Sequence, residues 1–216
     1  MTARAYHLQE LEIARSPADP RRVMPVILPR HRRILDIGAG AGQTLIASEL
    51  TAEVLAVGVD VDQAALRLGR ELTQQIAFSA AQAEALPFAD ATFDLVLARV
   101  SLPWTNLPAA VQELGRVTQA GGDVWLVLHS LRKTMRDLAD NLRRGQAKHA
   151  LYRSYVLANG LTWHLTGHLV RNPFSAHERY ESFQTVTAMR RALAAAGFVD
   201  LVVQQNPHFV ITARKA

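Results

Sequence analysis

The sequence contains no cysteine, which excludes disulfide bonds, thiolate catalysis and cysteine-based zinc sites. It also lacks a long apolar run, since runs such as residues 124–128 are far too short to span a bilayer. The N-terminus shows no apolar segment followed by a small-residue cleavage site, as a signal peptide would. We therefore expect a soluble, cytoplasmic protein.

The 216 residues, 49% of them hydrophobic, are enough for one globular domain with a sizeable core. We expect residues 1–216 to form this single domain. Residues 1–30 are polar and contain four prolines, so they form an N-terminal lead-in or a lid, with a short helix around Leu8, Leu11 and Ile13. Residues 131–182 look like an insertion and a substrate cap.

Short apolar segments alternate regularly with helical patterns from residue 33 onward. Strands separated by amphipathic helices predict βαβ units and a mostly parallel sheet. The last two strands are joined by a short turn and predict an antiparallel hairpin. The expected fold is thus α/β, a Rossmann-like doubly wound sheet of seven strands that ends in this hairpin. The predicted strands are 34–37, 54–59, 76–78, 93–98, 124–128, 198–203 and 209–213, and the predicted helices are 43–50, 62–72, 106–117, 131–142 and 185–196; 145–182 shows no clean period, and Gly121-Gly122 should break the chain.

Three glycines, Gly38, Gly40 and Gly42, alternate directly after the first strand. Glycine allows a tight turn there and lets a ligand approach the backbone closely. Exposed N–H groups at the start of the next helix would suit a carboxylate or a phosphate. A phosphate-binding P-loop is excluded because Gln43-Thr44 follows, where that loop needs Lys and Ser or Thr.

A dinucleotide-binding loop usually reads Gly-x-Gly-x-x-Gly and rarely has an acid two residues before its first glycine, where Asp36 lies. The segment Ile-Leu-Asp-Ile-Gly-Ala-Gly-Ala-Gly-Gln-Thr (34–44) instead resembles the first motif of the class I S-adenosylmethionine-dependent methyltransferases. Val-Gly-Val-Asp (57–60) resembles their second motif, and residues 82–96 resemble two segments of the quinone-biosynthesis-like branch (methyltransferase type 11). The resemblance covers about 33–130 and the C-terminal hairpin, and leaves out 131–182.

This resemblance implies S-adenosylmethionine as cofactor and S-adenosylhomocysteine as product. Asp60 would bind both ribose hydroxyls, because a carboxylate offers acceptors to a vicinal diol. Gln82 stands where the family usually has an Asp that contacts the adenine amino group, and the Gln oxygen can still accept from that amine. Asp36 would orient the ammonium end of the cofactor. The predicted cofactor-binding residues are Asp36, Gly38, Ala39, Gly40, Asp60, Val61, Gln82, Ala83 and Arg99.

The acceptor side is predicted less sharply. Trp104 lies where the family often has an aromatic residue or His near the methyl-transfer site, and Tyr6 would belong to the lid. The predicted substrate-pocket residues are Tyr6, Trp104, His129, His164 and Tyr180. His164 and His168 have the spacing of two metal ligands, but no third ligand is near, so we expect no metal site. No catalytic residue is predicted, because methyl transfer from a sulfonium depends mainly on positioning.

The leading hypothesis is in-line methyl transfer to O, N or C of a small molecule. The net charge of +5 is concentrated in residues 131–153, which contain seven basic and two acidic residues. A nucleic acid or an acidic small molecule therefore remains an alternative acceptor. A nicotinamide-dependent oxidoreductase and a non-catalytic cofactor-binding protein are the remaining alternatives.

Overall fold

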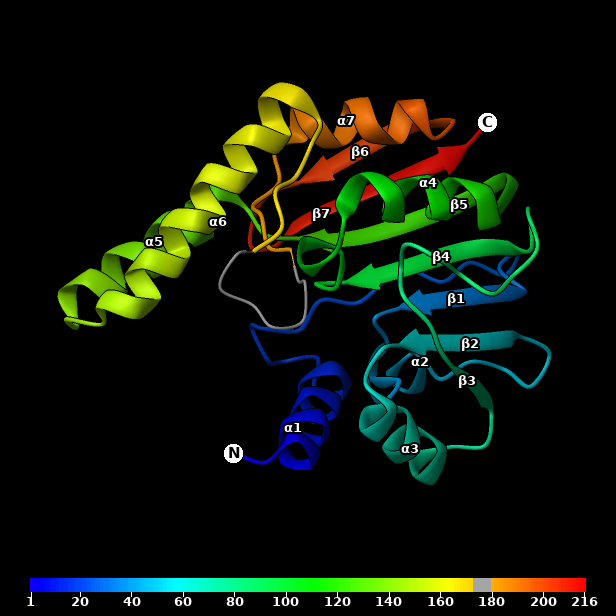
Figure 1. Cartoon of the computed structure of the whole chain (residues 1–216). Helices are drawn as coiled ribbons and strands as arrows, with labels where there is room; N and C mark the ends of the chain where they lie inside the picture. Colours follow the sequence, from blue (N-terminus) through cyan, green and yellow to red (C-terminus); the bar gives the residue numbers. More distant parts are fainter. Residues whose placement is uncertain (173–179) are drawn as a thin grey trace.

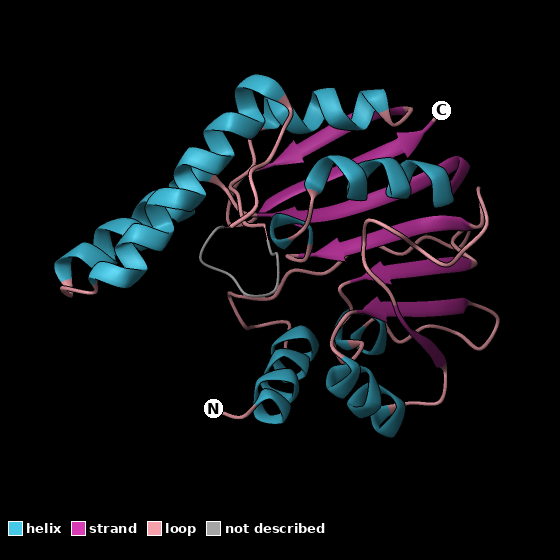
Figure 2. Ribbon diagram, in the orientation of Figure 1, coloured by secondary structure: helices cyan, strands magenta, loops and turns pink. Residues whose placement is uncertain are grey.

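The computed structural model describes residues 1–172 and 180–216, and its centre is a seven-stranded sheet (Figures 1 and 2). The strand order is β3-β2-β1-β4-β5-β7-β6; the first five strands are parallel, and β7 is antiparallel to both of its neighbours. The predicted fold class is therefore confirmed. The elements are α1 (Ala3–Arg15), β1 (Arg33–Ile37), α2 (Gln43–Ala47), β2 (Leu55–Asp60), α3 (Gln63–Leu72), β3 (Ile76–Ala80), β4 (Phe93–Arg99), the 3-10 helix η1 (Leu102–Trp104), α4 (Leu107–Val117), β5 (Thr118–Leu128), α5 (Leu131–Arg143), α6 (Ala147–Thr166), α7 (Val186–Ala195), β6 (Phe198–Gln204) and β7 (Phe209–Lys215).

The strand order reverses between β1 and β4. The chain runs from β1 to β2 and β3 on one side and then returns to β4 on the other side of β1. Open α/β sheets bind ligands at such a switch point, outside the carboxyl ends of the strands. The loop after β1 and the loop after β4 meet here, where the Ser101 hydroxyl donates to the Ile37 carbonyl at 2.5 Å.

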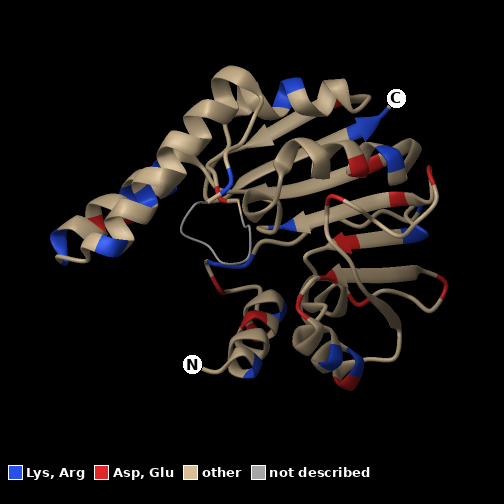
Figure 3. Cartoon of the chain, viewed as in Figure 1, with Lys and Arg blue, Asp and Glu red and all other residues tan. Residues whose placement is uncertain are grey.

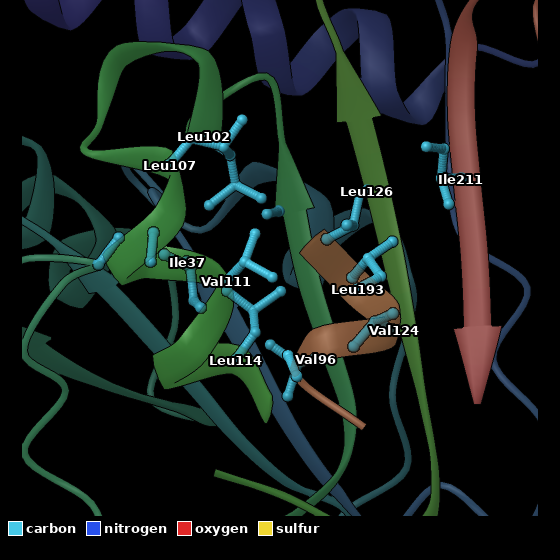
Figure 4. Close-up of a cluster of buried hydrophobic side chains, with 14 of the residues drawn as sticks. Ile37, Val96, Leu102, Leu107, Val111, Leu114, Val124, Leu126, Leu193 and Ile211 are labelled. Carbon is cyan, nitrogen blue, oxygen red and sulfur yellow. The ribbon is translucent and has the colours of Figure 1, made fainter. Parts of the chain in front are cut away.

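The two faces of the sheet bury separate hydrophobic clusters, because successive side chains of a strand point to opposite faces. On β1, Ile34 packs in a cluster with Leu45 of α2, whereas Leu35 belongs to a larger cluster under α4 and α7. Figure 4 shows part of the larger cluster, including Ile37, Val96, Leu102, Leu107, Val111, Leu114, Val124, Leu126, Leu193 and Ile211. These buried side chains pack β1, β4 and β5 against α4 and α7, next to the switch point.

The strand β5 is longer than predicted and runs through Gly121-Gly122, where we expected a break. Its register with β4 shifts from Phe93↔Thr118 to Leu95↔Asp123, so four residues of β5 bulge out between the two pairs. Gly121 takes a left-handed φ of 75° in this bulge. The glycine pair therefore kinks the strand and does not end it. The helix predicted at 43–50 is shorter than expected, since α2 ends at Ala47.

The helix α6 was not predicted, because residues 145–182 show no clean apolar period. Its buried face includes Asn159 and Gly160 beside Val156 and Trp163, so the apolar stripe is interrupted twice. Helices α5 and α6 pack along each other and extend from the body of the molecule (Figure 1). Residues 173–179, which include His177 of the predicted cap, lie outside the described residues. Among the described helices, each is too short or too polar to cross a membrane.

Gly160 provides the first test, because a Cβ built on it would lie 2.2 Å from the ring of Phe183, which is 4% exposed. Alanine usually stabilises a helix by about 1 kcal/mol relative to glycine. We expect Gly160→Ala to do the reverse and lower the free energy of unfolding by roughly 1–3 kcal/mol through overpacking.

Urea unfolding would measure this effect, with Leu161→Ala at an exposed position of the same helix as the control. A Gly160→Ala protein as stable as the wild type would contradict the packing of α6 on Phe183.

Candidate functional site

One cavity of about 1490 Å³ lies at the carboxyl ends of the parallel strands. Ligand pockets typically measure about 300–1,000 Å³, so this cavity has room for two small ligands. Most of the residues predicted for the cofactor and the acceptor line it, whereas Asp36 and His164 are absent from the lining. The predicted residues in the lining are Tyr6, Gly38, Ala39, Gly40, Asp60, Val61, Gln82, Ala83, Arg99, Trp104, His129 and Tyr180.

The glycine loop is held close to both neighbouring strands. Gly38 has a φ of 71°, and a Cβ on it would lie 2.2 Å from the Cβ of Ser101, so the position accepts no side chain. The amides of Gly38 and Ala39 donate to the Val59 carbonyl at 2.8 and 2.9 Å, and the Gly40 amide donates to Asp60. These three amides are therefore bonded within the protein and fix the course of the loop.

Asp60 ends β2 and faces the cavity with a fixed carboxylate. Its Oδ2 accepts from the Gly40 amide at 2.8 Å, and its Oδ1 accepts from the Asp62 amide at 2.9 Å. An ionised carboxylate has about four acceptor positions, so each oxygen can accept one further hydrogen bond. Two parallel acceptors at the cavity wall fit a vicinal diol, as in a ribose.

Asp36 lies beneath the loop and is 1% exposed. Its Oδ1 atom has no hydrogen-bond partner among the described residues. Burial raises the pKa of Asp36 to about 7; the positive charge of Arg99 opposes this shift, and the negative charge of Asp60 adds to it. A cation bound in the adjacent cavity would favour the ionised form of Asp36, so the ammonium group of an amino-acid ligand suits this place.

Helix α1 forms a wall of the cavity beside the glycine loop, where a Cβ built on Gly40 would lie 3.1 Å from the His7 ring. Arg99 connects it to the sheet, because its guanidinium donates to Thr44 Oγ1 and to Glu10 Oε2, both at 3.1 Å. The Gln43 side-chain amide and the His7 imidazole form a second link at 2.8 Å. These four partners of α1 and α2 line the cavity and were not predicted.

The sequence held only a weak signal for these residues. Gln43 and Thr44 directly follow the glycine loop, which could have marked them. His7 and Glu10 show no recognisable pattern, because α1 was predicted from its apolar residues alone. Their positions follow from where α1 docks.

The cavity continues to the β5 side, where Trp104 and His129 meet edge to face with ring centroids 5.9 Å apart. Lys133, Arg153 and Arg171 line the wall beyond them. Burial, together with the positive charges of Lys133 and Arg153, lowers the pKa of His129 to about 4. His129 is therefore neutral at physiological pH. The two basic residues were predicted only as part of a charged segment.

His164 lies outside the cavity, contrary to the prediction that it belongs to the substrate pocket. Its Nδ1 forms a 2.8 Å hydrogen bond with the hydroxyl of Thr185, the residue that caps α7. The histidine therefore connects α6 to α7. Among residues 1–172 and 180–216, no three His, Asp or Glu side chains are grouped as metal ligands would be.

Comparisons with known proteins agree with this geometry. Residues 34–122 match the model of a methyltransferase domain family. The chain is 35% identical over 138 residues to a malonyl-[acyl-carrier protein] O-methyltransferase of Halorhodospira halophila, covering 58% of this chain and 44% of that protein. It is 38% identical over 100 residues to a demethylmenaquinone methyltransferase of Roseiflexus castenholzii, covering 44% and 42%. The matches thus span less than half of these curated relatives.

Solved structures share this fold. A Thermotoga maritima structure described as an S-adenosylmethionine-dependent methyltransferase, possible histamine N-methyltransferase, superposes with a TM-score of 0.59. It is 16% identical, and the match covers 99% of this chain and 91% of that one. At this identity the likeness concerns the fold alone.

The buried Asp36 predicts a pH-dependent stability. Its pKa is about 7 in the folded protein and 3.8 without burial, so between these values the folded state binds more protons than the unfolded state. The stabilising contribution is complete below the lower value and is lost as pH rises through 7. The amide side chain introduced by Asp36→Asn cannot titrate. Between pH 5 and pH 8 we therefore expect the free energy of unfolding to fall more in the wild type than in Asp36→Asn, and the difference between the two falls to be at most about 2–3 kcal/mol.

Urea unfolding of both proteins at the two pH values isolates this contribution, because the other titrating groups are shared. An equal loss of stability in wild type and Asp36→Asn would show that Asp36 does not titrate in this range.

Proposed function

Since residues 34–122 match a methyltransferase domain family, we propose that this chain is a class I S-adenosylmethionine-dependent methyltransferase that transfers the methyl group of S-adenosylmethionine to a small-molecule acceptor. The observation that carries the proposal is the fixed carboxylate of Asp60 at the cavity wall, one βαβ unit beyond the glycine loop. We also propose that residues 1–216 act as one domain, with α1 as the lid and the α5–α6 hairpin as the cap.

The chain's own residues suit each part of this cofactor. Asp60 would accept from the two ribose hydroxyls, and Gln82, with the backbone of Ala83, would contact the adenine. The unpartnered oxygen of Asp36 favours a positive charge near the ammonium end. Tyr6 of α1 would cover the bound molecule. When bound, S-adenosylmethionine supplies a methyl group already activated by its sulfonium.

The remaining task of the protein is to position the acceptor and exclude water. Holding two reactants in line can contribute up to about 7–11 kcal/mol to lowering a barrier. Trp104 and His129 line the cavity beside the loop after β4 and would orient the acceptor. His129 is a weak base at neutral pH, because its pKa is about 4, so we assign it a positioning role.

The alternatives are less well supported. A nicotinamide-dependent oxidoreductase is disfavoured by the buried Asp36, two residues before the first glycine. A non-catalytic binding protein would be consistent with Gln82 in place of the usual Asp, but Asp60 and the glycine loop keep their expected geometry. The relatives named for malonyl-[acyl-carrier protein] and demethylmenaquinone act on different acceptors, so they do not point to one acceptor for this chain.

The ribose assignment is tested by Asp60→Asn. The amide keeps the size of the side chain but offers one acceptor oxygen and no charge, so charge-assisted hydrogen bonds are lost. We expect S-adenosylhomocysteine to bind at least about tenfold more weakly in calorimetry. The control Asp90→Asn replaces an exposed acid that pairs with Arg116 outside the cavity. Equal affinity in Asp60→Asn and wild type would remove Asp60 from the proposed site.

Trp104 tests the acceptor side. Its side chain is 41% exposed and lines the cavity, so Trp104→Ala should cost little stability. We expect turnover with an identified acceptor to fall about tenfold or more, with the affinity for S-adenosylhomocysteine changed less than threefold, because the ring would orient the acceptor and not the cofactor. A protein that is destabilised but turns over normally would assign Trp104 to packing.

A further inference from the structure

We propose that the acceptor carries a carboxylate or phosphate group, bound by Lys133, Arg153 and Arg171 on the β5 side of the cavity. This inference rests on the proposed function and adds the chemical class of the acceptor. The β2 side, with Asp60, and the β5 side, with Lys133, are separated by β1 and β4. At the usual strand spacing this separation is roughly 14 Å, so the two sides can hold two different molecules.

The charges of the lining are unevenly distributed along the cavity. Asp60 and Asp62 lie at the end of β2. Glu84 accepts from the Asn106 amide at 2.6 Å, and Glu10 pairs with Arg99 at the end of β4. The β5 side carries Lys133, Arg153 and Arg171, and within the described part of the chain no carboxylate lines that side. A cavity wall of one sign concentrates ligands of the opposite sign. The β5 side therefore favours an anion.

The carboxylates that pair with Lys133 and Arg153 lie off the lining. Asp137 accepts from Lys133 Nζ at 2.7 Å and lies 3.7 Å from Arg153. Glu181 is completely buried and accepts from Arg153 at 2.6 Å and from the Tyr152 hydroxyl. The Arg153 guanidinium is thus held in place by two carboxylates that lie off the lining. It needs little reordering to bind an anion in the cavity.

Arg171 comes from the segment after α6, and its Nε donates to the Tyr180 hydroxyl at 3.2 Å. Both residues line the cavity. An arginine fork matches the paired oxygens of a carboxylate or a phosphate, and a lysine adds a point charge. Three elements, α5, α6 and this segment, therefore bring such groups to one wall.

His129 lies close enough to these groups to be affected by their charges. Its pKa is lowered by burial and then by Lys133 and Arg153, and the raising effect of Asp137 is the smallest of the four causes. An anion bound there would restore part of the lost affinity of His129 for a proton.

The other basic residues of segment 131–153 do not share this position. They are exposed and absent from the cavity lining, and Figure 3 shows them along the α5–α6 hairpin. An enclosed anion would use Lys133 and Arg153, whereas an extended polyanion would use the exposed set. The exposed set is Arg132, Arg136, Arg143, Arg144 and Lys148.

The test begins with the full chain saturated with S-adenosylhomocysteine. Benzoate and phenyl phosphate serve as anionic probes and benzamide as the neutral probe of similar shape, each titrated by calorimetry. We expect at least one anionic probe to bind at least about tenfold more tightly than benzamide. Lys133→Gln should weaken that probe about tenfold, whereas Arg132→Gln, one residue away on the same helix and off the cavity lining, should not.

Two further readouts keep the result unambiguous. The imidazole signals of His129 should shift on binding of the anionic probe, and its pKa should rise. If S-adenosylhomocysteine binds but the probes do not differ, or if Arg132→Gln weakens the probe as much as Lys133→Gln, the anionic acceptor is refuted and the cofactor assignment stands. If S-adenosylhomocysteine does not bind at all, the proposed function fails and this inference fails with it.

Discussion

The hydrogen bond from the Gly40 amide to the Asp60 carboxylate is the interaction on which the site depends. It ties the loop after β1 to the end of β2 and at the same time fixes the carboxylate at the cavity wall. The loop can make this contact because Gly38 and Gly40 adopt left-handed backbone angles and leave no side chain in the way. One polar contact therefore sets both the shape of the loop and the direction of the Asp60 carboxylate.

The parallel sheet then determines which other groups reach the cavity. Asp36, Asp60 and Arg99 share one face of the sheet, since alternate residues of paired strands point the same way. Arg99 uses this position to connect Glu10 of α1 to the sheet. Asp60 and Asp62 lie at the end of β2, whereas Lys133 and Arg153 reach the other end of the cavity because the α5–α6 hairpin leaves the sheet directly after β5. A cationic cofactor and an anionic acceptor fit this division.

Much of the fold could be predicted, because the strands are continuous apolar runs and most helices carry regular apolar stripes. The glycine loop and Asp60 were identified from their spacing and from their resemblance to the first two motifs of the methyltransferase family. Helix α6 was missed because Asn159 and Gly160 interrupt its buried face, and no local pattern reveals that Gly160 packs on Phe183. Lys133 resembled any solvated lysine, since its place in the cavity depends on how α5 docks. The same dependence on tertiary packing explains why His164 was assigned to the pocket although it bonds to Thr185.

The central claim is that the cavity on the β2 side binds an adenosyl amino acid. Calorimetric titration of the wild-type chain with S-adenosylhomocysteine, with NADH and NADPH titrated in parallel, tests it most directly. The account predicts micromolar binding of S-adenosylhomocysteine and no measurable binding of either dinucleotide. Binding of a dinucleotide without S-adenosylhomocysteine would contradict it, because Asp36 and the glycine loop would then serve a different cofactor.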